Sequence, residues 1–152
     1  MKKEFVMRAQ TVSGGQEVLE FGGRQKENRN MAYRMTEFEL YPSTNIAGAS
    51  AEMVGTVTAG KTAIAPTDPN FNNEGLIATT SFFSGVNNDL INNTNSVVNY
   101  TFIITQNLII MVQDQASGGN PINWQCRFKA VKMTDAEMAA NNFKQYMISD
   151  GS

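Results

Sequence analysis

The stretch from Ser96 to Lys132 constrains the fold more than any other part of this chain. It holds the densest apolar runs, the only tryptophan and the only cysteine, and no charged residue occurs between Leu90 and Gln113. Val97–Thr105 and Leu108–Gln113 flank Gln106 and Asn107. A tight turn there is compatible with Asn, which tolerates the left-handed conformation, so we predict two paired strands. One long continuous strand is the alternative.

Two further features place this stretch at the centre of a β-rich domain. Residues Ile109–Val112 are apolar on both faces, so we expect core on one side and a helix or another subunit on the other. Ile122–Met133 shows the clearest alternation in the chain. Its inward side chains are predicted to be Trp124, Cys126, Phe128 and Ala130.

The rest of the chain shows the same strand signals. Apolar and polar residues alternate in Glu4–Val12 and Met31–Tyr41. Shorter strands are predicted over Glu17–Phe21 and Ala51–Ala59, and a further strand, rich in Thr and Phe, over Leu76–Phe83. In Met31–Tyr41, one side is predicted to hold Tyr33, Met35, Glu37, Glu39 and Tyr41. Asn-rich and Gly-rich segments, including Gly60–Gly75 and Gly85–Asn95, are predicted to be loops.

The chain is predicted to end in one helix. Thr134 and Glu137 match the capping box that begins a helix, which we expect over residues 134–150. A broad apolar face is predicted to hold Met138, Phe143, Tyr146 and Met147. We therefore predict a single mainly β domain over residues 1–152. Its fold is an antiparallel β-sandwich or barrel, jelly-roll-like, with about eight strands and the C-terminal α-helix.

Composition excludes several classes of protein. Charged residues make up 17% of the chain, against about 25% in typical domains, and the net charge of −2 argues against binding through phosphate contacts. The absence of histidine removes Ser-His-Asp triads and most zinc sites. Cys126 is predicted to be a buried structural thiol. We predict no secretory signal and no membrane span, because apolar runs are absent at the N-terminus and are interrupted by Asn elsewhere.

Three motifs resemble chemical sites. Gly55–Thr62 satisfies the phosphate-loop pattern, but Pro66 follows it and no alternation of strands and helices surrounds it, so we interpret the match as coincidental. Asp68–Glu74 offers oxygen ligands at alternate positions yet lacks the spacing of a calcium-binding EF-hand loop. Glu37 and Glu39 share a strand face, which is commoner for exposed carboxylates than for acid–base pairs. We predict no catalytic residues, no cofactor, no metal and no enzymatic activity.

The aromatic residues are candidates for recognition. A sugar-binding platform is conceivable from Tyr33, Tyr41, Phe71, Phe82, Phe83, Tyr100 and Trp124. Most of them occur in strand patterns and are predicted to lie in the core. Phe71 is the exception, because it lies in a polar loop where an exposed ring is a suitable interface anchor.

Short strands, loops rich in Asn, Thr and Gly, low charge, no histidine and a terminal helix together resemble the small virion proteins of tailed bacteriophages and related viruses. The resemblance is one of composition, extends over the whole chain and carries over no individual site. It implies a capsid, decoration, connector or tail component that is assembled in the host cytoplasm. Its partners would be copies of itself and other structural proteins, without a membrane or specific nucleic-acid contact.

The leading hypothesis is a non-enzymatic assembly protein that packs into a symmetric oligomer. Uncharged β-surface, the long loops and the terminal helix would form its contacts. The predicted interface residues are Phe71, Ile109, Met111, Phe143 and Tyr146. The alternative is a β-sandwich binding module for a carbohydrate or a small apolar ligand, which requires a pocket lined by aromatics with convergent polar groups.

Overall fold

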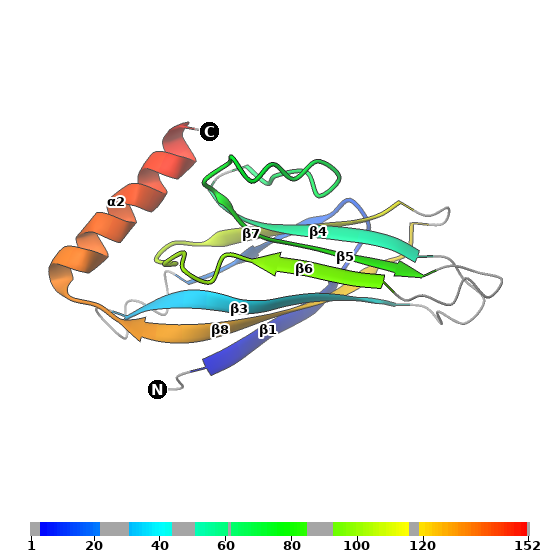
Figure 1. Cartoon of the computed structure of the whole chain (residues 1–152), viewed down its shortest axis with the longest axis horizontal. Coiled ribbons are helices and arrows are strands. Elements are labelled where there is room, and N and C mark those ends of the chain that lie inside the picture. The colour runs from blue at the N-terminus through cyan, green and yellow to red at the C-terminus, as the bar shows by residue number, and fades with distance from the viewer. Residues whose placement is uncertain are drawn as a thin grey trace.

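Alternating apolar and polar residues build the strands, of which the described residues form eight, followed by one helix (Figure 1). The computed structural model describes residues 4–21, 31–43, 51–60, 62–84, 93–115 and 119–151. The elements are β1 (Glu4–Thr11), β2 (Gln16–Leu19), β3 (Met31–Pro42), β4 (Ala51–Ala59), β5 (Leu76–Ser84), β6 (Asn93–Val98), β7 (Leu108–Asp114), β8 (Ile122–Lys132) and α2 (Asp135–Gly151).

The described strands form two antiparallel sheets that lie in two layers (Figure 1). Sheet A has the order β1-β8-β3, and sheet B has the order β2-β7-β4-β5-β6. The predicted β-sandwich with a C-terminal helix is therefore confirmed. The alternative of a barrel is wrong, because no ladder of hydrogen bonds joins the two sheets among the described strands.

The strands pair from the two ends of the chain inward. β1 pairs with β8, β2 with β7 and β4 with β5. β3 and β6 are edge strands of different sheets, and they meet where the Ser96 hydroxyl donates a hydrogen bond of 2.8 Å to the Phe38 carbonyl oxygen. This winding is that of a jelly roll, except that β6 pairs with β5 instead of β3.

The core lies between the two sheets. Four aromatic rings, those of Phe5, Phe21, Tyr33 and Phe128, form a cluster with centroid separations of 4.9 to 6.3 Å. Trp124, Cys126 and Phe128 point inward as predicted, and Ala130 is partly buried. The Trp124 indole N–H donates to the Thr11 hydroxyl at 2.9 Å. Burial raises the pKa of the Cys126 thiol well above its usual range, so this cysteine is held as an inert thiol.

The predicted strand Val97–Thr105 is wrong. β6 ends at Val98, and the Asn99 carboxamide then accepts hydrogen bonds from the backbone N–H and the hydroxyl of Thr101, at 3.2 and 2.7 Å. This side-chain turn interrupts the extended chain before the next apolar residues. β6 and β7 consequently do not pair with each other, which excludes both the predicted hairpin and the single long strand. β7 lies instead between β2 and β4.

Strand β3 contains a bulge that the alternation alone did not show. Its register against β8 shifts between Met35 and Glu37, where β3 has one extra residue. The side chains that face the core therefore change from odd-numbered to even-numbered positions along the strand. Met35 is buried before the shift, and Phe38 and Leu40 are buried after it. The prediction that Tyr33 and Met35 share a side with the later odd-numbered residues is therefore wrong.

Helix α2 begins at the predicted capping box. The Thr134 hydroxyl accepts from the Glu137 N–H, and the Glu137 carboxylate accepts from the Thr134 N–H, each at 3.2 Å. The helix then runs across one end of the sandwich (Figure 1). No helix in the described part of the chain is long and apolar enough to cross a membrane.

Candidate functional site

Helix α2 is attached to the sandwich mainly through polar side chains. Gln145 is 3% exposed, and its side-chain oxygen accepts hydrogen bonds from the N–H and hydroxyl of Thr105 and, at 3.2 Å, from the Gln106 N–H. One turn earlier, Asn142 accepts from the Gln106 carboxamide at 2.9 Å. The irregular segment that follows β6 thus supplies the donors that hold the helix in place.

Apolar packing on this side of α2 is limited. Ile148 is partly buried and lies against Gly75, where an added Cβ would come within 3.1 Å of the Ile148 side chain and 2.7 Å of the Ala59 carbonyl oxygen. The absence of a side chain at Gly75 therefore allows the helix to approach β4. Lys144 lies at the side of the contact, with its ammonium 5.7 Å from the centroid of the Phe102 ring.

The opposite side of α2 is an exposed apolar stripe. We define the α2 stripe as Ala136, Ala140, Phe143 and Met147, which are all exposed. Their spacings of four, three and four residues place them in one row along the helix. Phe143 is 65% exposed and Met147 is 54% exposed. Met138, which was predicted on the same face, is partly buried on the side that faces the sandwich.

The other predicted interface residues lie on different parts of the surface. Phe71 is 65% exposed and borders a groove of about 250 Å³ beside β5 and β6. Ile109 and Met111 are partly buried on the outer face of β7. The side chain of Tyr146 lies outside the described part of the structure. The structure does not bring Phe71, Ile109 and Met111 together with Phe143 into one site.

The chain itself covers part of the outer face of sheet B. Thr58 and Thr56 of β4 pair with Ile109 and Met111 of β7. The Thr56 hydroxyl donates to the Ile64 carbonyl oxygen at 2.6 Å, and the Thr58 hydroxyl accepts from the Ile64 N–H at 3.2 Å. The segment after β4 therefore folds back over this face (Figure 1). The loop therefore lies over β4, the neighbour of β7, on the face where Ile109 and Met111 are partly buried.

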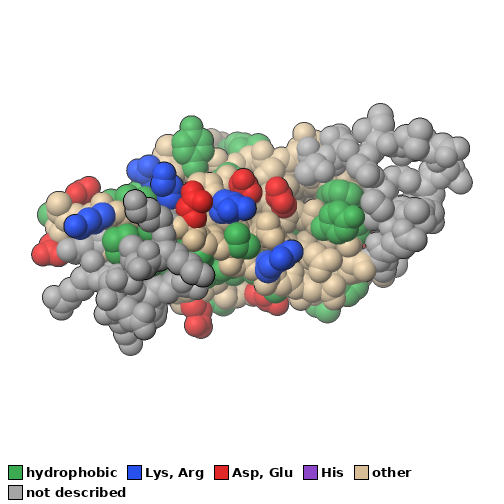
Figure 2. Space-filling view, turned by 90° about the horizontal axis from the view of Figure 1, so that it is seen from below, with side chains coloured by type: hydrophobic (Ala, Val, Ile, Leu, Met, Phe, Trp, Pro, Cys, Tyr) green, Lys and Arg blue, Asp and Glu red, His purple; other side chains and the backbone are tan. Residues whose placement is uncertain are grey.

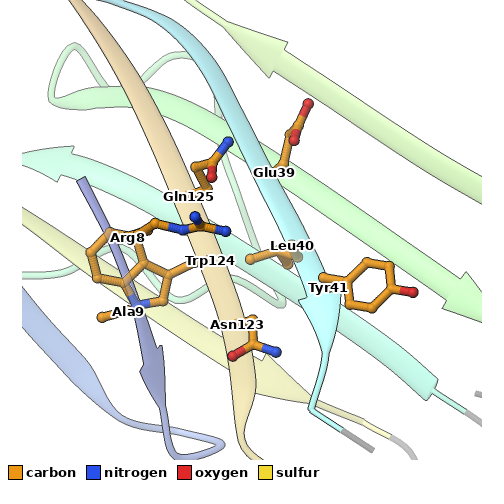
Figure 3. Close-up of a pocket in the computed structure, with 8 residues that line it drawn as sticks. All are labelled: Arg8, Ala9, Glu39, Leu40, Tyr41, Asn123, Trp124 and Gln125. Atoms are coloured by element: carbon orange, nitrogen blue, oxygen red, sulfur yellow. The ribbon is translucent and has the colours of Figure 1, made fainter. Parts of the chain in front are cut away.

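A second candidate site is a groove of about 630 Å³ on the outer face of sheet A (Figure 3). Its lining comes from all three strands of that sheet: Arg8, Ala9, Glu39, Leu40, Tyr41, Asn123, Trp124 and Gln125. Arg8 and Glu39 both pair with Gln125, so these residues form one row across the sheet. Asn123 and Tyr41 belong to the next row.

Polar groups in this groove are available for a ligand. Among the residues that the structure describes, the side chains of Arg8, Glu39 and Gln125 have no hydrogen-bond or ion-pair partner. Asn123, in contrast, already has a partner, because its side-chain oxygen accepts a hydrogen bond from the Gln10 carboxamide at 3.0 Å. Figure 3 shows Arg8 extending toward β8 and Tyr41 pointing past the edge of β3.

Tyr41 forms the apolar side of the groove. Its ring is 59% exposed and is steadied by Phe82, with the two centroids 6.1 Å apart. The prediction that the strand aromatics lie in the core is confirmed for Tyr33, Phe82 and Trp124. It is wrong for Tyr41, Phe83 and Tyr100, which are exposed.

The surface around the groove is mixed in charge. In the view from below, basic and acidic side chains lie beside one another instead of separating into patches (Figure 2). Glu37 and Arg127 form one such pair at 3.3 Å, on a neighbouring row of sheet A. Glu39, which shares a strand face with Glu37, lines the groove. Charges of both signs therefore balance locally on this face.

The remaining motifs are parts of ordinary structure. β4 extends through residues 55–59 of the phosphate-loop match, so the backbone is straight where a phosphate loop curves, and Lys61 lies outside the described residues. In the acidic loop, the Asn70 and Asn73 side chains accept hydrogen bonds from the N–H groups of Asn72 and Gly75, each at 2.9 Å. These amides therefore stabilise local turns.

No protein family model matches this chain, and a search of curated proteins found no match.

Proposed function

We propose that this protein is a non-enzymatic structural protein that self-associates through the α2 stripe. The observation that supports this proposal is the orientation of the helix. α2 buries Gln145 against its own domain and leaves Phe143 and Met147 in water. An ordinary surface helix does the reverse, with its apolar stripe toward the core.

The free energy of burial favours a partner on this stripe. Fully burying a Phe or Met side chain contributes about 1.5–3 kcal/mol relative to leaving it exposed. A contiguous apolar row on a helix is also a common recognition element for another protein. Since the helix is held by hydrogen bonds that Thr105 and Gln106 donate to Gln145, the stripe stays available without unfolding any part of the sandwich.

We further propose that the assembly is part of a virion. Low charge and loops rich in Asn support this setting, as does the jelly-roll winding, which recurs in viral capsid domains. The partners would be copies of this chain and other structural proteins. The stripe could supply one contact and Phe71 another, because these surfaces belong to separate parts of the molecule.

Light scattering across a hundredfold dilution tests self-association. We expect the wild-type protein to show a mass above that of the 16.7 kDa chain at high concentration and to dissociate on dilution. The double variant Phe143→Ser/Met147→Ser should be a monomer throughout. The matched control is Val12→Ser/Tyr100→Ser, which removes two equally exposed apolar side chains elsewhere and should associate like the wild type. A wild-type monomer at every concentration would refute the proposal, as would an unchanged mass in the stripe variant.

A second candidate function is binding of a neutral oligosaccharide in the groove of sheet A. Arg8 supplies donors, Glu39 supplies acceptors and Gln125 supplies both, which matches the hydroxyl groups of a sugar. The exposed ring of Tyr41 offers a flat surface for the C–H face of a pyranose. The two charges cancel, which favours an uncharged ligand, and the volume lies within the usual range for ligand sites of about 300–1,000 Å³.

A screen of neutral oligosaccharides by calorimetry tests this second function. We expect saturable binding by the wild type and a loss of about tenfold or more in affinity for Tyr41→Ala and Gln125→Ala. Tyr100→Ala removes an exposed ring outside the groove and serves as the control. Absence of binding across the screen, or equal affinity in Tyr41→Ala and Tyr100→Ala, would exclude the groove as a sugar site.

A further inference from the structure

The α2 stripe is asymmetric along its length. Its N-terminal half presents the methyl groups of Ala136 and Ala140, and its C-terminal half presents the large side chains of Phe143 and Met147. A helix pair packs best when large side chains of one helix lie against small ones of the other. The stripe therefore carries both halves of such a contact.

The spacing of these residues is self-complementary. When two copies of α2 lie antiparallel, with Ala140 of one opposite Phe143 of the other, Ala136 comes opposite Met147 at the same time. Both pairs then occur twice, as a two-fold axis requires. A parallel pair would place Phe143 against Phe143 and leave a gap between the alanines.

Charge at the margin of the stripe favours the same orientation. Glu137 and Lys144 are seven residues apart, so they lie on one flank of the stripe, and both are exposed. In an antiparallel pair, equivalent flanks of the two helices meet. Glu137 of one copy then lies within about one helical turn of Lys144 of the other, close enough for the long side chains to pair. In a parallel pair, the acidic first turns, with Asp135 and Glu137, would lie side by side.

We propose, on the basis of the self-association above, that the partner of the stripe is α2 of a second copy, packed antiparallel about a two-fold axis. The helix has 17 residues and is therefore about 25 Å long. A contact of this length buries less than the roughly 1,200–2,000 Å² of a standard stable interface, so a dissociable dimer is expected. Figure 1 shows α2 running across the end of the sandwich, where its outer side is open to such a partner.

Site-specific cross-linking of the full chain tests the orientation. One preparation carries Ala136→Cys and a second, distinguishable by an affinity tag, carries Met147→Cys. A short bismaleimide should join the mixed pair much faster than it joins either preparation to itself. Cys126 is buried and should not compete, and Val12→Cys, which places a thiol in the turn after β1, controls for random collision.

Charge reversal gives an independent readout. Lys144→Glu and Glu137→Lys should each raise the dissociation constant of the dimer by about tenfold, because each brings like charges together twice. The double variant Lys144→Glu/Glu137→Lys should associate more tightly than either single variant, although it lacks the carboxylate of the capping box. Lys129→Glu, on the exposed face of sheet A, is the control and should have no effect.

The outcomes separate this inference from the proposed function. Cross-links mainly within each preparation, or a double charge variant as weak as the single ones, would overturn antiparallel pairing. Self-association that still depends on Phe143 and Met147 would leave the proposed function standing. A chain that remains monomeric at every concentration would refute both.

Discussion

Replacing Phe128 by alanine is expected to lower the free energy of unfolding by about 3–5 kcal/mol, a large part of the roughly 5–15 kcal/mol typical of a domain. The Phe128 ring is fully buried and lies 4.9 Å from the Phe21 centroid and 5.4 Å from that of Phe5. Its removal leaves a cavity between the sheets that rigid strands cannot close. Urea unfolding followed by the fluorescence of Trp124 measures the loss.

The exposed Val12, in the turn after β1, provides the control for this substitution. Val12→Ala should change the unfolding free energy by no more than about 0.5 kcal/mol, as expected of a surface site. Equal effects of the two substitutions would mean that the aromatic cluster is not the centre of the core.

Replacing Gln145 by alanine is expected to cost about 2–3 kcal/mol, although the residue is polar and lies on a surface helix. Its side-chain oxygen accepts from two groups of Thr105 and from the Gln106 N–H, and a buried donor without a partner costs about 1–3 kcal/mol. Hydrogen exchange should show loss of protection in α2 and at Thr105 before the sheets are affected. Urea unfolding should give the magnitude.

The matched control for Gln145→Ala is a substitution of the exposed Phe143, which lies two residues earlier in the same helix. Phe143→Ala should leave the unfolding free energy within about 0.5 kcal/mol of the wild type when the protein is diluted to a monomer. A polar residue would then matter more to stability than an aromatic one two positions away. The reverse order of effects would show that the helix packs through its apolar stripe.

Local patterns in the sequence were sufficient to predict most of the strands and the start of the helix. The predicted strands Ala51–Ala59 and Ile122–Met133 match β4 and β8 closely, and the capping box placed the start of α2. The segment after Val98 was missed because its β-branched and aromatic residues have high strand propensity. The carboxamide of Asn99 overrides that propensity by forming a turn.

The candidate surfaces depended on contacts that no local pattern contains. The sequence of α2 allows apolar residues on several sides, and the choice of the contact side depends on Thr105, which lies 40 residues before Gln145. The groove of sheet A likewise unites Arg8, Glu39 and Gln125, which are neighbours only through the pairing of β1 and β3 with β8. The strand patterns indicated that each of these side chains points outward. Only the order of the strands in the sheet shows that the three side chains are neighbours.

The winding of the chain also governs when the protein can fold during synthesis. β8 is the neighbour of both β1 and β3 in sheet A, and Glu4 pairs with Lys129. On the ribosome, β1 and β3 must therefore wait for residues 122–132 to emerge from the exit tunnel before they can form their sheet. Contacts so distant along the chain make folding slow, and unpaired strand edges are prone to aggregation while they wait. The need for chaperones during translation should therefore depend on when β8 is synthesised.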